Sequence, residues 1–189
     1  MRVTLTDIKN NDAEFFDRVR NAPVFISTVN RLGLQVDIGI SQHNAVFQIW
    51  KPSWVLQRPP GHDRTLRIHF EAKDRREMRV EVGPEPWIAS LDSKPELRAT
   101  LVPMLERKAR VISALRGRLI GAADIPAQFE ANTYRLLAPT NTASHGIVKF
   151  SGCGYGDDPS VDQAARWFAQ VIEVVTPIID SVAARHQEG

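Results

Sequence analysis

The 189-residue chain has a single cysteine, Cys153, and lacks long runs of apolar residues. One thiol excludes an intramolecular disulfide and a cysteine-rich zinc module. It is typical of a protein from a reducing compartment, because structural disulfides form in oxidising ones. The first residues lack the apolar core of a signal peptide, and no run approaches the roughly 18 apolar residues that a membrane span needs. We therefore expect a cytoplasmic protein that does not enter a membrane.

Neither sign of charge dominates the composition. There are 24 basic and 22 acidic residues, which gives a net charge of +2. Hydrophobic residues make up 43% and charged residues 24%, close to the average for soluble globular proteins. Such a composition can form a core, which excludes disorder of the whole chain and the collagen-like and coiled-coil classes. The length fits one domain, so we expect a single domain over residues 1–189.

The small net charge conceals an uneven distribution along the chain. Residues 1–63 carry a net charge of +1, residues 64–120 carry +5 and residues 121–189 carry −4. A basic middle segment indicates an acidic protein or nucleic acid as a partner. Acidic residues are interleaved throughout that segment, however, so a solvated surface is the alternative interpretation.

The hydrophobic periodicity predicts an α+β fold. A helix is expected from about Asn11, and residues 23–32 form either a second helix or a strand. Residues 51–63, rich in proline, indicate a surface loop. Period-two alternation predicts two hairpins, formed by strands at 34–40 and 45–50 and by strands at 66–72 and 78–82. A helix follows at 96–115, then two short strands at 134–137 and 147–150, and a last helix from Val161.

The last helix has the clearest pattern in the chain. Its apolar residues recur at spacings of three and four for about 25 residues, which gives a wide apolar face. Ser160 and Gln163 have the spacing of a capping box, and Pro177 is expected to bend the helix. We predict a mostly antiparallel sheet of about five to six strands packed by helices. This order of elements resembles that of some partner-binding chaperones of bacterial secretion systems, which is a likeness of fold alone.

The triplet Glu71-Ala72-Lys73 lies on the third predicted strand. It resembles the acid-x-Lys element of the PD-(D/E)xK nuclease superfamily. That resemblance implies a metal-dependent nuclease in which Asp37 and Glu71 hold Mg²⁺ and Lys73 activates the attacking water. Alternation places Glu71 and Lys73 on one face, as this chemistry requires.

Two features of the sequence favour a structural interpretation of the same triplet. The family's upstream acid usually lies one strand before the glutamate, and the strand at 45–50 has no acidic residue. A hairpin with charged outer positions also forms cross-strand ion pairs, here Glu71 and Lys73 against Arg79 and Glu81. The histidines show no metal-binding spacing.

Tryptophans and basic residues supply the remaining candidates for ligand contact. Trp50, Lys51 and Trp54 can stack on bases or grip a proline-rich peptide, or they can cover the edge of the core. The basic candidates lie at a hairpin tip and on a helix; they are Lys73, Arg75, Arg76, Arg107, Lys108 and Arg110.

No complete catalytic set emerges from these candidates. We therefore expect a non-catalytic protein-binding or adaptor domain without a cofactor, which can form a homodimer through its C-terminal helix. The alternatives are the metal-dependent nuclease, with Mg²⁺ as its cofactor, and a nucleic-acid-binding protein without catalysis.

Overall fold

The structure is a computed structural model of the chain. It describes residues 5–40, 45–58, 65–83, 95–121, 134–136, 146–151 and 158–187. The predicted turn at 41–44 and Cys153 lie outside these ranges, as do residues 59–63 of the loop expected at 51–63. All statements below concern the described residues.

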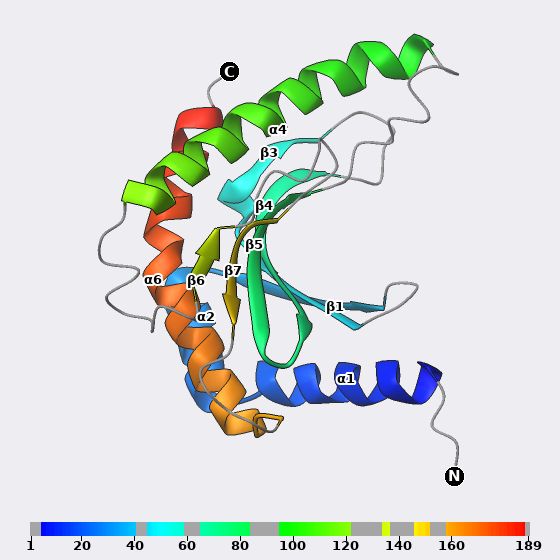
Figure 1. The fold of residues 1–189 in the computed structure, drawn as a ribbon, viewed down its shortest axis with the longest axis vertical. Helices are drawn as coiled ribbons and strands as arrows, with labels where there is room; N and C mark the ends of the chain where they lie inside the picture. Colours follow the sequence, from blue (N-terminus) through cyan, green and yellow to red (C-terminus); the bar gives the residue numbers. More distant parts are fainter. Residues whose placement is uncertain are drawn as a thin grey trace.

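The fold is α+β, as the sequence predicts, with an antiparallel sheet and a long C-terminal helix (Figure 1). Its helices are α1 (Leu5–Arg20), α2 (Pro23–Leu32), the 3₁₀ turn η1 (Pro52–Trp54), α4 (Pro95–Gly121) and α6 (Val161–Gln187). Its strands are β1 (Gln35–Ile40), β2 (Ala45–Trp50), β3 (Val55–Gln57), β4 (Leu66–Asp74), β5 (Glu77–Gly83), β6 (Tyr134–Leu136) and β7 (Gly146–Ser151).

The sheet has the strand order β1-β2-β4-β5-β7-β6, and every neighbouring pair is antiparallel. The short strand β3 pairs with the beginning of β4, next to the segment of β4 that pairs with β2. Both predicted hairpins are confirmed, and the residues at 23–32 form a helix, which ends at Gly33 in the left-handed conformation.

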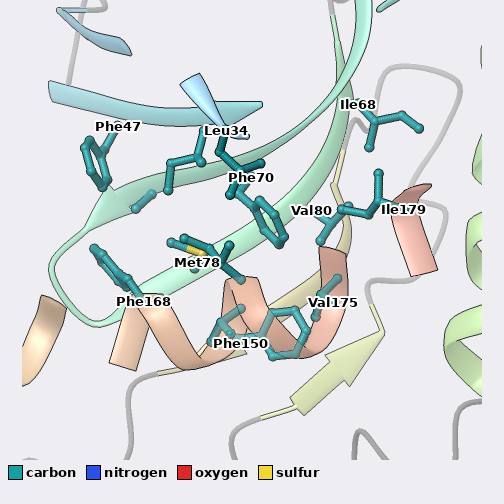
Figure 2. Packing of buried hydrophobic residues seen from close by; sticks show 14 of the residues in the cluster. Leu34, Phe47, Ile68, Phe70, Met78, Val80, Phe150, Phe168, Val175 and Ile179 are labelled. Atoms are coloured by element: carbon teal, nitrogen blue, oxygen red, sulfur yellow. The ribbon is translucent and has the colours of Figure 1, made fainter. Parts of the chain in front are cut away.

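The core lies between one face of the sheet and the helices. Figure 1 shows α6 running along one side of the sheet, with α1 and α2 at one end and α4 at the other. Figure 2 shows side chains from β2, β4 and β5 pointing toward α6. Phe47 stacks on Phe16 and Phe168 with ring centroids 5.2 and 6.1 Å apart, and Phe25 of α2 lies 5.5 Å from the same ring.

The capping box at the start of α6 is confirmed. The backbone N–H of Ser160 donates to the side chain of Gln163 at 2.9 Å, and the N–H of Gln163 donates back to the Ser160 hydroxyl at 3.2 Å. By length and hydropathy α6 is the one described helix that could cross a membrane, but 56% of its most apolar window is buried inside the structure. This burial is the property of a core helix.

Two local predictions differ from the structure. Helix α1 begins at Leu5 and not at Asn11, because Leu5 and Ile8 continue the helical spacing that leads to Phe15 and Val19. The proline-rich stretch predicted as a surface loop contains η1 and β3. It is fixed there because Trp54 is fully buried in the core.

Candidate functional site: the polar face of the sheet

One face of the sheet is polar, and it lies opposite the core. On β4 the residues Leu66, Ile68 and Phe70 are buried in the hydrophobic core, so alternation turns the residues between them to the other side. Cross-strand pairing adds side chains from neighbouring strands to that side. We call this the polar face; it carries Asp37, Gln48, Trp50, Arg67, His69, Glu71, Glu77, Arg79, Glu81 and Lys149.

Three of these polar residues are buried. His69, Glu71 and Glu81 are each 5 to 6% exposed, although alternation alone would place them on an outer face. His69 and Glu71 lie two residues apart on β4, and Glu81 of β5 pairs directly with His69. One ligand atom from each of the three lies within 4.8 Å of the others. The cluster therefore combines an imidazole and two carboxylates in a site shielded from water.

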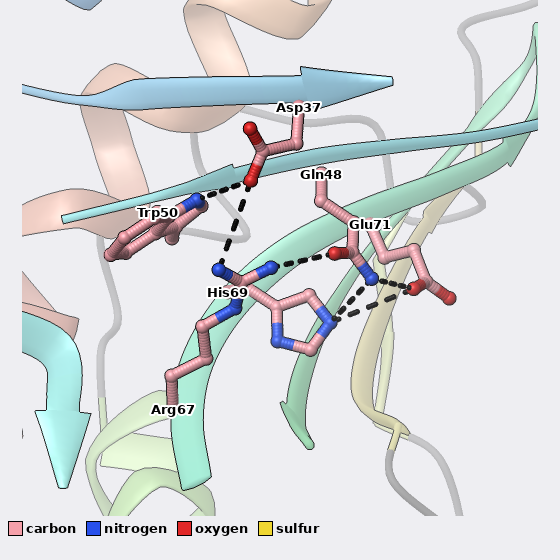
Figure 3. A network of polar contacts seen from close by, with 6 residues as sticks. All are labelled: Asp37, Gln48, Trp50, Arg67, His69 and Glu71. Atoms are coloured by element: carbon pink, nitrogen blue, oxygen red, sulfur yellow. Dashed lines mark hydrogen bonds and ion pairs between the residues drawn. The ribbon is translucent and has the colours of Figure 1, made fainter. Parts of the chain in front are cut away.

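Gln48 links this cluster to the neighbouring cation (Figure 3). Its amide nitrogen donates to Glu71 Oε2 at 2.7 Å, and its amide oxygen accepts a hydrogen bond from Arg67 at 2.7 Å. Burial lowers the pKa of the Arg67 guanidinium from its ordinary value, while the charges of Asp37 and Glu71 oppose that shift. Arg67 is thus a partly desolvated cation that is held between two carboxylates.

The structure does not bring Asp37 and Glu71 together. Asp37 pairs with Gln48 and Gln48 pairs with Glu71, so the two acids share a face but lie one strand apart. Asp37 Oδ2 accepts a hydrogen bond from Trp50 at 2.9 Å and lies 3.8 Å from Arg67. Since the Gln48 amide occupies the position between the two carboxylates, this geometry gives little support to a magnesium ion shared by them. The side chain of Lys73 lies outside the described residues.

The described contacts show part of the charge pairing on the β4–β5 hairpin. Glu71 does pair with Arg79 in the strand register. Arg79, however, forms its ion pair with Glu77, which also binds Lys149 from β7. Glu71 itself is buried, so it is not part of a solvated row of charges.

Both candidate tryptophans contact residues of the same chain. The guanidinium of Arg67 lies 4.4 Å from the ring centroid of Trp50, in cation–π geometry. Trp54 is fully buried and its indole N–H donates to Asp180 of α6 at 2.7 Å. Lys51 bonds the other oxygen of the same carboxylate at 2.7 Å. Asp180 thus fastens η1 to α6, which agrees with an edge-of-core role for Trp54.

The basic residues at the hairpin tip contact acidic residues of the same chain. Arg75 binds Asp12 of α1 at 2.8 Å and its guanidinium lies 4.6 Å from the ring centroid of Phe15. Arg76 binds Asp158, just before α6, at 2.9 Å, and both of these side chains are largely exposed.

The basic residues of α4 occupy three different environments. Arg107 donates to the backbone oxygen of Leu56 at 2.6 Å, and Lys108 is buried. Arg110 is exposed to solvent. A continuous basic surface that could follow a nucleic-acid backbone is therefore not formed by these residues together.

The site residues that sequence reasoning missed are His69, Gln48 and Glu81. The signal present in the sequence is the His69-x-Glu71 spacing, which places both side chains on one face of a strand. Its partner Glu81 can be identified only from the register of the hairpin.

Comparison with known proteins identifies no relative of this chain. The chain matches no protein-family model, no curated protein and no solved structure. Its function must therefore be argued from its own residues.

Proposed function

We propose that the chain is a non-catalytic protein-binding domain, and that it binds a second copy of itself by adding a strand at β1. The proposal depends on one observation, the free edge of this strand. β1 pairs with β2 along all six residues, and no described strand pairs with its other side.

The residues of β1 do little to protect this edge. Natural edge strands are commonly blocked by lysine, proline or a bulge. The segment Gln35–Ile40 contains neither lysine nor proline, and its register with β2 is regular throughout. The opposite edge of the sheet, β6, is only three residues long. The backbone groups of β1 that pair with no described strand thus offer a template for a further antiparallel strand.

The sequence of β1 is compatible with pairing to itself. A two-fold axis beside Ile38 would place Val36 opposite Ile40 and Asp37 opposite Gly39 of the second copy. In that register two aspartates do not face each other, so like-charge repulsion is avoided. Val36 and Ile38 are only half-buried, and an added strand would cover them further.

The C-terminal helix provides a weaker interface than its sequence indicates. Its apolar side chains pack against the sheet within the same chain, including Phe168, Val175 and Ile179. The exposed large hydrophobic residues of the described structure are instead Val24, Ile26 and Val102 on α2 and α4.

Sedimentation equilibrium of Gly39→Lys tests this proposal. A Cβ atom at Gly39 meets nothing within 4 Å, so the fold accepts a side chain there, and lysine on an edge opposes strand addition. We expect the unchanged chain to form dimers and Gly39→Lys to remain monomeric. Gly117→Lys on α4 is the matched control, because Gly117 has the same free space, and it should dimerise normally. A monomeric unchanged chain, or a dimeric Gly39→Lys protein, would contradict the proposal.

A further inference from the structure

We propose that His69, Glu71 and Glu81 bind a divalent transition-metal ion between β4 and β5. All three side chains are buried, and one ligand atom from each lies within 4.8 Å of the others. This site is independent of strand addition at β1, because it uses none of the residues of that strand.

The spacing of His69 and Glu71 is close to that of two ligands of a tetrahedral metal ion. His69 Nε2 lies 3.6 Å from Glu71 Oε2. Two ligands of a tetrahedral ion at bond lengths of about 2.1 Å lie about 3.4 Å apart. These two ligands therefore need almost no movement, and Glu81 approaches from the strand position opposite His69.

The His69 ring provides a second, separate observation. It is 5% exposed, and among the described residues its Nδ1 atom has no hydrogen-bond partner. Its Nε2 atom lies 3.5 Å from the Gln48 amide nitrogen, beyond the usual range of such hydrogen bonds. Buried polar groups are nearly always bonded. A metal bond at Nε2, the ring nitrogen that faces Glu71, would supply an interaction that no hydrogen bond of ordinary length supplies to that atom here; Nδ1 is the other ring nitrogen and is not the proposed ligand atom.

Neighbouring residues hold the ligands in place. Metal-binding carboxylates are usually oriented by an outer shell of hydrogen bonds. Gln48 serves this role for Glu71 at 2.7 Å and is itself fixed by Arg67. Gly83 lies against the other side of the site, where a Cβ atom would come within 3.0 Å of His69 Cε1. The ring orientation thus depends on a residue without a side chain.

The ligand set selects the class of ion. Two carboxylates together neutralise a divalent cation, which favours its transfer into a buried site. An imidazole ligand suits zinc, iron or nickel, whereas magnesium and calcium prefer oxygen ligands alone. We therefore infer an ion of the Zn²⁺ or Ni²⁺ type and not the Mg²⁺ that Asp37 and Glu71 suggest in the sequence.

Two rival arrangements would stabilise the same carboxylates without a metal. They could share a proton, as close carboxyl pairs do. Alternatively an ammonium group could neutralise them, and Lys108 is the buried cation of α4, a helix that contacts β5. Both rivals predict that the protein takes up no ion.

Calorimetric titration of the metal-free full chain with ZnCl₂, and separately with NiCl₂, distinguishes these cases. We expect one ion per chain, and a cobalt-substituted protein with the visible absorption of a four-coordinate site. Glu81→Gln and His69→Gln should each weaken zinc binding by more than the roughly 10- to 100-fold caused by loss of an outer-shell partner. Glu106→Gln, at an exposed glutamate of α4, is the matched control and should bind zinc normally. Absence of uptake, or equal affinity in Glu81→Gln and Glu106→Gln, would overturn the proposal.

Gly83→Ala provides a test that keeps all three ligands. Its methyl group displaces the His69 ring, so zinc affinity should fall at least tenfold while circular dichroism shows a folded protein. Gly117→Ala on α4 adds the same methyl group where nothing lies within 4 Å, and it should leave the affinity unchanged. Equal affinity in the two folded variants would contradict the assignment of His69 as a ligand.

Discussion

Gln48 on β2 donates a hydrogen bond to Glu71 on β4 across 2.7 Å, on the polar face of the sheet. The same amide accepts a hydrogen bond from Arg67, so one neutral side chain separates a buried carboxylate from a partly buried cation. Because both charged groups are desolvated, the amide supplies interactions that water would supply on an exposed face.

Replacing Gln48 tests the importance of this link. Gln48→Ala removes a donor to Glu71 and an acceptor for Arg67, so the free energy of unfolding should fall by about 1–3 kcal/mol. Urea denaturation followed by circular dichroism measures the change. Gln170→Ala, at an exposed position of α6, is the control and should alter stability by less than about 0.5 kcal/mol. Equal stability of the two variants would show that the link contributes little.

A second prediction concerns Asp180, which joins η1 to α6 through Trp54 and Lys51. Asp180→Ala leaves the indole N–H of a fully buried tryptophan without its acceptor, so unfolding should become easier by about 1–3 kcal/mol. Thermal and urea denaturation both report this loss. Asp162→Ala removes an exposed ion pair with Arg166 on the same helix and should cost about 0–1 kcal/mol. A smaller loss for Asp180→Ala than for Asp162→Ala would refute this role.

The sequence predicts the fold well where apolar residues recur with one regular spacing over a long segment. The alternation of Leu66, Ile68 and Phe70 predicts β4, and spacings of three and four predict α6. The strand β3 was not predictable in this way, because three residues are too few to establish a period. Its position depends instead on Trp54, which is buried and donates a hydrogen bond to the carboxylate of Asp180. These two residues lie far apart in the sequence.

The candidate site was predictable only in part. Alternation correctly places Asp37 and Glu71 on one face, but it does not tell whether that face is covered or which strands lie between them. The register of β4 with β5 shifts between Glu71 and Asp74, so counting outward from the turn misplaces the partners of Glu71 by one position. The contact between His69 and Glu81 therefore required the structure.

Two adjacent arginines at the β4–β5 tip should differ in their contribution to stability. Arg75 is largely buried, binds Asp12 and lies over the ring of Phe15, whereas Arg76 binds Asp158 at an exposed site. Arg75→Ala should therefore lower the free energy of unfolding by about 1–2 kcal/mol, through the lost ion pair and cation–π contact. Arg76→Ala should change it by less than about 1 kcal/mol, because exposed ion pairs contribute little. Parallel urea titrations compare the two, and the reverse order would contradict the geometry.

Phe47 should be the most sensitive position of the core, because three helices meet the sheet at its ring. Phe16 of α1, Phe25 of α2 and Phe168 of α6 all lie within 6.1 Å of it, measured between ring centroids. Phe47→Ala leaves a cavity whose neighbours lie on three separate helices, and these helices cannot all move inward to fill it. The free energy of unfolding should therefore fall by about 3–5 kcal/mol. Hydrogen exchange of α1 and α2 should accelerate in the same variant, because their packing on β2 depends on this ring. Val102→Ala, at an exposed valine of α4, should change stability by less than about 0.5 kcal/mol. If Phe47→Ala loses no more than that control, the helices are held to the sheet by other contacts.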